Sequence, residues 1–359
     1  MAKKKLNQSE YTRYNRQLIL SEIGHAGQLK IKAAKVLVIG AGGLGCPILM
    51  YLTAAGIGSL GVVDYDNVDL SNLHRQVLYT NTDIGKNKAE VACSKLKKQN
   101  PEIDLIPYPF KLDKNNILNV ISKYDIVVDG SDNFPTRYLV SDACELLEKT
   151  LVFGAVHQFL GQASVFNYKN GPTYRCLFPE QPGVGEASSC ATAGVLGVLP
   201  GIVGGIQANE TLKIILEIGE SLSGKLWQIN ALDNQVEIIP FSKDSKRVKI
   251  TALGEYEIAC DWNVKELNST DFKTNHNLND FSIIDLRPSH QFELFNIGGI
   301  NLSREEIIDD INLIKTSKKI LFICQIGEQS AEIANFVQTK IASIEVYSLA
   351  GGINSWNNK

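Results

Sequence analysis

Short apolar runs alternate with helix-like segments along the first part of the chain. Four of these runs predict buried strands: 33–40, 59–66, 103–110 and 125–132. Three segments between them have the length and spacing of helices: 45–56, 85–101 and 115–124. Strands and helices that alternate at this spacing favour a parallel, doubly wound sheet.

The apolar pattern changes after residue 150. Residues 151–168 predict further strands, for which antiparallel pairing is an open alternative, and 191–218 are apolar on almost every side, which predicts a pair of buried helices. A charged connector begins near residue 240, and a smaller strand–helix alternation follows it. We therefore predict an α/β fold, with a doubly wound, mostly parallel sheet over 1–248 and a small α/β domain over 249–359.

Charge and cysteine usage narrow the function classes. Lys and Arg number 36 against 39 Asp and Glu, so we expect no broad nucleic-acid or membrane surface. No apolar run reaches about 18 residues, and the start, MAKKKLNQSE, lacks the apolar core of a signal peptide. We therefore expect a cytoplasmic protein without a membrane helix. The seven cysteines include no C-x-x-C pair, which argues against a disulfide framework and against a zinc site built from such pairs.

A glycine-rich turn joins the first predicted strand to the first predicted helix. Its sequence, GAGGLG, supplies Gly40, Gly42, Gly43 and Gly45. Such a turn brings backbone N–H groups and a helix N-terminus close to phosphate. Asp64 ends the next strand about 20 residues later, where a ribose-binding acid is expected. The pattern predicts nucleotide binding, but a nicotinamide dinucleotide fits it as well as ATP does.

Polar side chains that follow the predicted strands favour ATP. Parallel strands end at one edge of a sheet, so residues that follow them gather there. The candidates are Asn72, Arg75, Gln76, Lys88 and Asp132. Cations together with an acid suit a triphosphate and Mg²⁺ better than a nicotinamide dinucleotide, and Asp132 is the candidate magnesium ligand.

The first two thirds of the chain resemble the ThiF/MoeB/HesA group of the ubiquitin-activating-enzyme-like superfamily. The matching segments are RYNRQ, VLVIGAGGLG, VVDYDNVDLSNLHRQ, DIVVDGSDNFPTR and SSCATAGVLGVLPGIVGGIQANETLK. The resemblance implies a homodimeric adenylyltransferase that uses ATP and Mg²⁺ to activate the C-terminal Gly-Gly carboxylate of a ubiquitin-like sulfur carrier protein.

The resemblance also implies a role for each matching residue. Asp64 would hold the ribose, Arg75 and Lys88 the phosphates, and Asp132 the Mg²⁺ ion. Arg16 would reach a phosphate in the neighbouring subunit. A carboxylate is already a nucleophile at neutral pH, so the site needs cations that stabilise the phosphates rather than a general base.

Two cysteine positions bear on this resemblance. The family usually has a Cys-Tyr-Arg-Cys and a later Cys-x-x-Cys that bind zinc, but here Thr173 replaces the first cysteine and the second pair is missing. We therefore predict no zinc site and expect Cys176 to be buried and idle.

The resemblance places a crossover-loop cysteine at Cys190. This thiol could bond to the carrier or resolve a disulfide, and a helix N-terminus would favour its thiolate. A small core residue is the alternative for Cys190.

The last hundred residues resemble the rhodanese-like domain. The segments IIDLRPSHQFELFNIGGINLS and SLAGGINSW match its patterns, in order, around Cys324. In rhodaneses a short loop follows the cysteine and leads into a helix, and backbone N–H groups stabilise the thiolate and its persulfide. The sequence CQIGEQS has that length and a central Gly327. A domain that only docks a partner, with an idle cysteine, is the alternative.

The loop after Cys324 departs from that pattern in its charge. Many active members carry Arg beside the cysteine and at the fifth place beyond it, where this chain has Gln325 and Gln329, with Glu328 before the latter. A small anionic sulfur donor such as thiosulfate should therefore be attracted poorly. A protein persulfide should be affected less.

Together these patterns predict adenylation of a ubiquitin-like sulfur carrier followed by sulfur transfer through a Cys324 persulfide, as in activators of molybdopterin synthase. A cysteine desulfurase is a candidate sulfur donor. Activation for thiamin or tRNA thiolation is the alternative pathway. An NAD-dependent oxidoreductase would explain the glycine turn but not the cations around it. A non-catalytic scaffold would bind the carrier without forming AMP.

Overall fold

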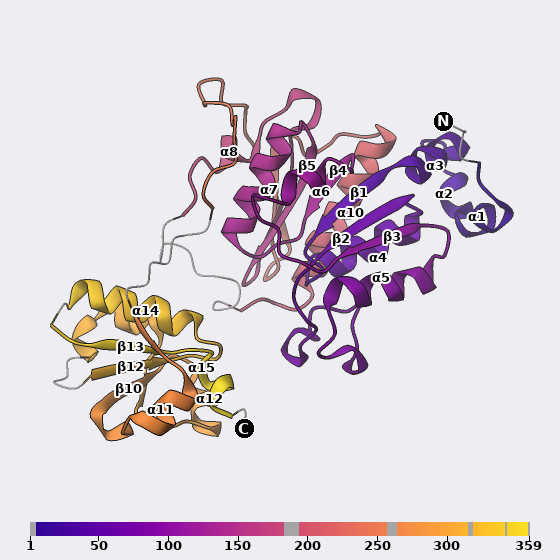
Figure 1. The fold of residues 1–359 in the computed structure, drawn as a ribbon. Helices are drawn as coiled ribbons and strands as arrows, with labels where there is room; N and C mark the ends of the chain where they lie inside the picture. Colours follow the sequence, from indigo (N-terminus) through magenta and orange to yellow (C-terminus); the bar gives the residue numbers. More distant parts are fainter. Residues whose placement is uncertain (1–4, 183–193, 257–263, 315–318, 342, 358–359) are drawn as a thin grey trace. The chain divides into compact units, whose positions relative to one another are not determined.

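The chain forms two compact units, Met1–Tyr256 and Glu257–Lys359 (Figure 1). The computed structural model describes residues 5–182, 194–256, 264–314, 319–341 and 343–357. The sequence predicts a boundary at 248, whereas the first unit extends to Tyr256. Residues beyond 248 remain with it because the Tyr256 hydroxyl donates to Asp142 Oδ2 at 2.7 Å and the Ile250 N–H donates to Glu145 Oε1 at 3.2 Å.

An eight-stranded sheet forms the centre of the first unit, with the strand order β3-β2-β1-β4-β5-β6-β7-β8. The strands are β1 (Lys35–Ile39), β2 (Ser59–Val63), β3 (Asp104–Tyr108), β4 (Ile126–Asp129), β5 (Thr150–His157), β6 (Leu160–Phe166), β7 (Lys225–Asn230) and β8 (Gln235–Pro240). Pairing is parallel from β3 to β5 and antiparallel from β5 to β8. The predicted α/β fold is confirmed, and the strands predicted over 151–168 pair antiparallel.

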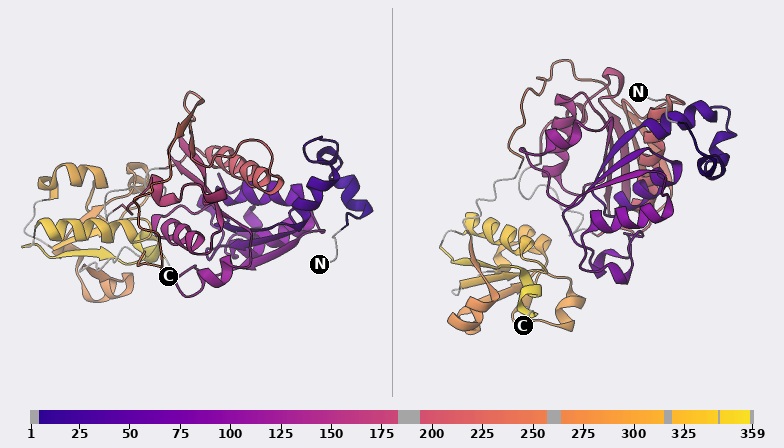
Figure 2. Two further views of the ribbon diagram at one scale, coloured as in Figure 1. Left: turned by 90° about the horizontal axis from the view of Figure 1, so that it is seen from above. Right: turned by 45° about the vertical axis from the view of Figure 1, so that its right-hand side comes forward.

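The helices of the first unit lie on both faces of this sheet (Figure 2). They are α1 (Gln8–Arg13), α2 (Asn15–Leu18), α3 (Gly24–Ala33), α4 (Gly45–Ala55), α5 (Lys88–Gln99), α6 (Ile117–Ile121), α7 (Phe134–Leu146), α8 (Tyr174–Leu177) and α10 (Leu199–Leu216). Side chains alternate along β1: Val36 and Val38 join the core under α4, α5 and α10, whereas Leu37 and Ile39 join the core under α6 and α7. This two-sided burial explains why the strands read as continuous apolar runs.

The helix α10 packs closely on α4. A side chain at Gly204 would place its Cβ 2.5 Å from Pro47 Cγ and 2.7 Å from Leu44 O, so only glycine allows this approach. The sequence predicts a helix pair over 191–218, but the described part of that segment, from residue 194 onward, forms one helix. It is apolar on most sides because it packs against α3, α4 and the sheet.

The second unit is a smaller α/β domain with a five-stranded parallel sheet of order β11-β10-β12-β13-β9. Its strands are β9 (Lys265–Leu267), β10 (Phe281–Asp285), β11 (Ile300–Asn301), β12 (Lys319–Ile323) and β13 (Val346–Leu349). Its helices are α11 (Ser269–Asn275), α12 (Ser289–Leu294), α13 (Arg304–Asp309), α14 (Glu328–Lys340) and α15 (Gly352–Asn357). One layer of buried side chains covers each face of β12, which places the end of this strand at the centre of the domain.

Over the part of the chain that the structure describes, no helix combines the length and the apolar character that crossing a membrane requires.

Candidate functional site

The glycine turn after β1 makes a tight backbone cradle against the end of β4. Gly40 has a φ of +86°, and a Cβ at this position would lie 2.7 Å from Gly130 O. A Cβ at Gly45 would lie 1.9 Å from Gly40 O. No side chain fits at either position, so the turn brings bare backbone and the N-terminus of α4 to one edge of the sheet, where the predicted phosphate site lies.

Asp64, the first residue after β2, contacts this turn directly. Its Oδ2 accepts a hydrogen bond of 2.8 Å from the Ala41 N–H, and its Oδ1 accepts one of 2.9 Å from the Asp66 N–H. Burial raises the pKa of this carboxyl, and the charge of Lys88 offsets part of the rise. The structure therefore brings the predicted ribose acid and the glycine turn together.

Lys88 is the first residue of α5 and is buried near the turn. Its Nζ lies 3.0 Å from Asp66 Oδ2, a carboxylate that is half exposed. Tyr79 links the two segments, since its Oη lies 2.8 Å from Ala41 O and 3.2 Å from Lys88 O. The lysine predicted to hold a phosphate is thus close to the turn, and its partner is an exposed side chain that a phosphate could replace.

Arg75 and Gln76 lie beside the glycine turn, and Asn72 is hydrogen-bonded to both of them. Arg75 Nη2 and Gln76 Nε2 both donate to Asn72 Oδ1, at 2.8 Å and 3.3 Å. A Cβ at Gly42 would lie 3.4 Å from Gln76 Nε2, and one at Gly43 would lie 3.6 Å from Arg75 Cδ. All three predicted residues therefore belong to one cluster around the turn.

Asp132 follows β4 and is exposed. The neighbouring Gly130 and Ser131 lie against the turn, because the Ser131 nitrogen is 3.3 Å from the position of a Cβ on Gly40. Asp132 therefore follows a strand that ends at the same sheet edge as the glycine turn. Among the described residues, no group of three or more His, Cys, Asp or Glu side chains is arranged to hold a metal ion.

Arg16 is not part of this cluster. It lies on α2, where its side chain is exposed, and its guanidinium makes no hydrogen bond or ion pair with any described residue. The neighbouring Tyr14 anchors this segment, since its Oη accepts a hydrogen bond of 2.8 Å from Asn100 Nδ2. Cys190 lies outside the described residues. The backbone at Gly194 and Leu196, shortly after it, bonds to Gln158 of the β5–β6 hairpin.

A buried cluster on α7, which the sequence analysis does not predict, joins α8 to the segment after β8. Asp142 accepts hydrogen bonds from Arg175 Nε at 2.7 Å and Nη2 at 2.8 Å, in addition to that from Tyr256. One turn later, Glu145 Oε1 accepts a hydrogen bond of 2.5 Å from Arg247 Nη2. These contacts hold α8 and residues 247–256 against α7. No motif marks either acid, since the partners are far away in the sequence.

Cys176 lies on α8. The sequence predicts a buried thiol there, but in the structure the residue is only half-buried. Burial opposes ionisation of its thiol, but hydrogen bonds from Thr173 and from the Asp244 N–H outweigh that effect and lower the pKa of Cys176. By contrast, burial raises the pKa of Cys46 and of Cys93 to about 12.

Cys324 is at the C-terminal end of β12 and is 1% exposed. Its Sγ accepts hydrogen bonds from the Gly327 N–H at 3.1 Å and the Ser330 N–H at 3.4 Å. Ser330 Oγ lies 3.4 Å from the same sulfur and accepts a hydrogen bond of 2.8 Å from Ser348 Oγ. The loop thus surrounds the sulfur with neutral donors, the arrangement that the sequence predicts for a thiolate or a persulfide.

Arg287, which follows β10, and Gln325, which follows β12, both make contacts within the domain. Arg287 is buried and ion-paired with Asp285, with Nη2 and Oδ2 2.7 Å apart, and it also donates to Phe295 O at 2.7 Å. Gln325, which stands where many active members have Arg, is exposed, and its amide donates to Asn354 Oδ1. Arg287 is therefore committed to the fold rather than to an anionic substrate.

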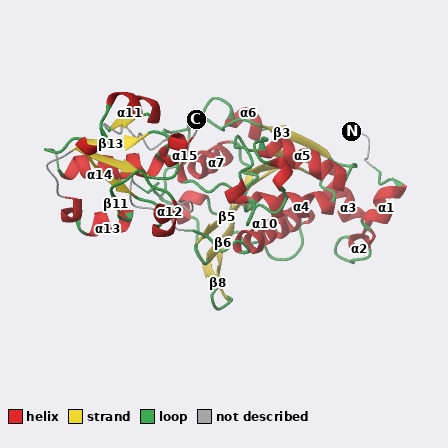
Figure 3. Ribbon diagram, turned by 90° about the horizontal axis from the view of Figure 1, so that it is seen from below, coloured by secondary structure: helices red, strands yellow, loops and turns green. Residues whose placement is uncertain are grey.

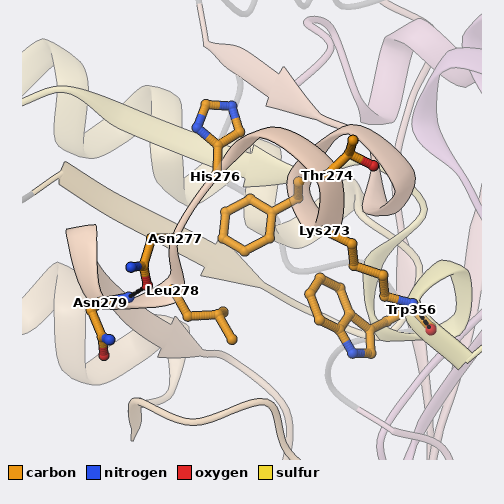
Figure 4. A pocket seen from close by; sticks show the side chains of 8 residues that line it. Lys273, Thr274, His276, Asn277, Leu278, Asn279 and Trp356 are labelled. Carbon is orange, nitrogen blue, oxygen red and sulfur yellow. Dashed lines mark hydrogen bonds between the residues drawn. The ribbon is translucent and has the colours of Figure 1, made fainter.

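A separate shallow pocket lies between α11 and the end of α15 (Figure 4). Lys273 points toward Trp356, with its Nζ 4.6 Å from the centre of the indole ring. The other lining residues are Phe272, Thr274, His276, Asn277, Leu278 and Asn279. Cys324 is not among them, so this pocket is distinct from the sulfur site.

Comparison with known proteins matches both units. The model of the ThiF family matches residues 14–250, and the model of the rhodanese-like domain matches residues 268–359. The two matches cover the same two parts of the chain in which the sequence resembles these families.

Three relatives illustrate the similarity. A sulfur carrier protein adenylyltransferase of Thermus thermophilus is 53% identical over 62% of this chain and 84% of its own length. The adenylyltransferase and sulfurtransferase MOCS3 of Aedes aegypti is 37% identical over 99% of this chain and 88% of its own length. A probable molybdopterin-synthase adenylyltransferase of Porphyra purpurea is 37% identical over 97% of this chain and 93% of its own length.

Among solved structures, the chain is similar to Escherichia coli MccB in complex with MccA-N7isoASN. The TM-score is 0.59 at 22% identity, over 68% of this chain and 75% of that one. At this level of identity the similarity concerns the fold alone.

Proposed function

The chain belongs to the ThiF family and carries a rhodanese-like domain, and from this we propose that it is an adenylyltransferase and sulfurtransferase that activates the C-terminal glycine of a ubiquitin-like sulfur carrier protein. One observation carries the proposal: the same chain holds a glycine turn with an acid and cations beside it, and a thiol that accepts two N–H hydrogen bonds. Adenylation creates an acyl group that a sulfur nucleophile can attack, and Cys324 supplies that nucleophile.

The residues around the glycine turn fit ATP. Gln76 is 3% exposed, and its Oε1 has no hydrogen-bond partner among the described residues, so a bound nucleotide can use it. Asp64 would hold the ribose, and Arg75 and Lys88 would hold the phosphates. The backbone of the turn leads into the N-terminus of α4, where N–H groups would bind phosphate.

Asp132 is the residue that would hold Mg²⁺. Proteins commonly bind this ion through one or two carboxylates together with substrate phosphates and water, so a single exposed carboxylate at the sheet edge fits the requirement. The ion would supply positive charge to the phosphates of ATP.

In the first step, a carboxylate oxygen of the carrier attacks the α-phosphorus of ATP, and the bond to pyrophosphate breaks. Arg75 and Lys88 stabilise the charge that develops on the phosphates. In the second step, the terminal sulfur of a Cys324 persulfide attacks the acyl carbon, the bond to AMP breaks, and an acyl disulfide forms.

A third step must release the product. A thiol, either Cys190 or an external reductant, attacks the sulfur of Cys324, breaks the S–S bond and releases the carrier as a thiocarboxylate. The attacking thiol forms a disulfide with Cys324, which an external thiol then reduces.

The outer strand β8 would receive the carrier (Figure 3). It is the last strand in the sheet, and all six of its residues are exposed. Val236 and Ile238 are 50% and 55% exposed, and Leu232 before the strand is 70% exposed. An apolar edge strand of this kind is typical of a surface that pairs with another protein.

We also propose a cytoplasmic homodimer in which Arg16 contacts a phosphate bound by the partner subunit. The side chain of Arg16 is exposed and without a partner among the described residues, as a contact in trans requires. A cysteine desulfurase is the proposed source of the persulfide sulfur, because the loop around Cys324 lacks the two arginines that would attract a small anion.

Molybdopterin-synthase activation is the pathway we favour, since relatives that match most of the chain carry that name or are MOCS3 proteins. Activation for thiamin or tRNA thiolation uses the same chemistry and remains the alternative. The cations around the turn disfavour an NAD-dependent oxidoreductase, and the buried thiol disfavours a scaffold without catalysis.

Two measurements on the purified chain test the proposal. ATP with Mg²⁺ should raise the melting temperature, whereas NAD should not. With a carrier that ends in Gly-Gly, the chain should catalyse exchange of pyrophosphate into ATP. Failure of exchange with several such carriers would refute the adenylation, and stabilisation by NAD instead of ATP would favour the oxidoreductase.

A further inference from the structure

We propose that His74 is a positioning residue that holds the guanidinium of Arg75 in its phosphate-binding orientation. This inference rests on the proposed function, which assigns Arg75 to the phosphates of ATP. His74 stands directly before Arg75 in the loop that follows β2, and no step described above uses it.

The contact between the two side chains fixes the tautomer of His74. Its Nε2 lies 2.8 Å from Arg75 Nη1. A guanidinium has only donors, so Nε2 must accept the hydrogen bond and the imidazole must be neutral, with its proton on Nδ1. His74 therefore acts here as a hydrogen-bond acceptor and not as a second cation.

The backbone before α10 holds the imidazole from another direction. A Cβ at Gly197 would lie 2.7 Å from His74 O and 3.2 Å from His74 Nδ1. Only a residue without a side chain can therefore sit against this histidine. The exposed ring thus has Gly197 close to its Nδ1 and the Arg75 guanidinium at its Nε2.

The other acceptors of Arg75 are also neutral. Nη2 donates to Asn72 Oδ1 at 2.8 Å, and Nη1 approaches Ser71 O at 3.4 Å. No carboxylate of a described residue lies within ion-pair distance of this guanidinium, whereas Lys88 is paired with Asp66. Neutral acceptors fix the direction of Arg75 and leave its charge available to an anion, which is what a phosphate ligand needs.

If His74 positions Arg75, position 74 needs a side chain that can accept a hydrogen bond, but it does not need an imidazole ring. In His74→Gln the amide oxygen can replace Nε2, while His74→Leu keeps a similar bulk without an acceptor. In pyrophosphate exchange with varied ATP, His74→Leu should raise the KM for ATP about tenfold and leave kcat within about threefold, because the loss of one charged hydrogen bond is worth about that factor. His74→Gln should stay within about threefold of the wild type in both constants.

A double variant separates positioning from a general effect on the fold. In an Arg75→Ala background, His74→Leu should cause no further rise in KM, since there is no guanidinium left to orient. If His74→Leu does not fold, His74→Met takes its place. The inference is overturned if the leucine variant matches the wild type, or if the glutamine variant is impaired as strongly as the leucine variant. A wild-type chain that gives no exchange would instead refute the proposed function.

Discussion

The thiols of this chain differ in what surrounds the sulfur. Burial among apolar side chains raises the pKa of Cys46 and Cys93 to about 12, so both thiols remain protonated at neutral pH. Hydrogen bonds to the sulfur lower the pKa of Cys176. Cys324 has N–H and hydroxyl groups around its sulfur although it is buried. The two N–H donors at its sulfur therefore distinguish the buried Cys324 from Cys93, where burial alone acts on the thiol.

This difference predicts an order of alkylation in the folded protein. As the pH rises toward 8, Cys176 should ionise first because its pKa lies below that of an ordinary thiol, whereas Cys46 and Cys93 should stay protonated until the pH approaches 12. Iodoacetamide at pH 8, followed by peptide mass spectrometry, should therefore find Cys176 modified well before the other two. Equal rates at Cys46 and Cys176 would contradict the assignment.

Asp64 gives a second prediction at this scale. Its carboxylate accepts two backbone hydrogen bonds and would also accept from the ribose, so protonation should weaken ATP binding. Because burial raises the pKa of Asp64, this weakening should begin at a higher pH than for an exposed aspartate, whose pKa is about 4. Calorimetric titration with ATP between pH 7 and pH 5 should show affinity falling with pH in the wild type. In Asp64→Asn, affinity should be lower at pH 7 and should fall less steeply with pH than in the wild type, because the part of the decline that belongs to Asp64 is removed; equal slopes in both proteins would exclude Asp64 as a cause.

Among the elements, α7 determines how the end of the first unit is held. Its Asp142 and Glu145 bind Arg175 of α8 and Arg247 of the segment after β8. Buried ion pairs are costly to leave half-made, because the remaining charge has no water around it. The pairs therefore hold α8 and the segment after β8 against α7.

Arg175→Met should destabilise the first unit by about 3 kcal/mol, since it leaves Asp142 as an uncompensated buried charge. Lys225→Met is the matched control, because it removes an ion pair with the exposed Glu220. Scanning calorimetry of the full chain should show a lower melting temperature for the first variant and an unchanged one for the control. Equal melting temperatures for both variants would show that the pair on α7 does not support the fold.

The elements also show what the sequence could and could not predict. The central strands, the glycine turn and Asp64 follow from local patterns, because strands covered on both faces are apolar and the ends of parallel strands meet at one edge. The pairing of Asp142 with Arg175 and Tyr256 could not be foreseen, since it joins residues 33 and 114 positions apart. For the same reason, nothing in the sequence near Tyr256 indicates its contact with α7, which extends the first unit past residue 248. The neighbours of Cys324 were predictable because one short loop supplies most of them.

At the scale of the molecule, one chain carries an activating site and a sulfur site. An acyl-adenylate is exposed to hydrolysis until a nucleophile arrives, so the proposed reaction needs the sulfur step to follow adenylation promptly. The proposed dimer adds a further requirement, because Arg16 would complete the site of the partner subunit.

Complementation tests the contact in trans. Arg16→Ala and Asp132→Asn should each exchange pyrophosphate poorly as pure homodimers. A mixture that has been allowed to exchange subunits should regain activity, because a mixed dimer has one site with both intact residues. Activity of the mixture equal to the mean of the two variants would mean that Arg16 does not act across a dimer.

The central claim is that adenylation and sulfur transfer are separate steps, of which only the second needs Cys324. The most direct test compares the wild type with Cys324→Ala, using a carrier that ends in Gly-Gly, ATP, Mg²⁺ and a persulfide donor. Pyrophosphate exchange and the intact mass of the carrier are measured on the same samples. We predict equal exchange in both proteins, with replacement of a carrier oxygen by sulfur in the wild type alone. Loss of exchange in Cys324→Ala, or thiocarboxylate formed equally by both, would contradict the account.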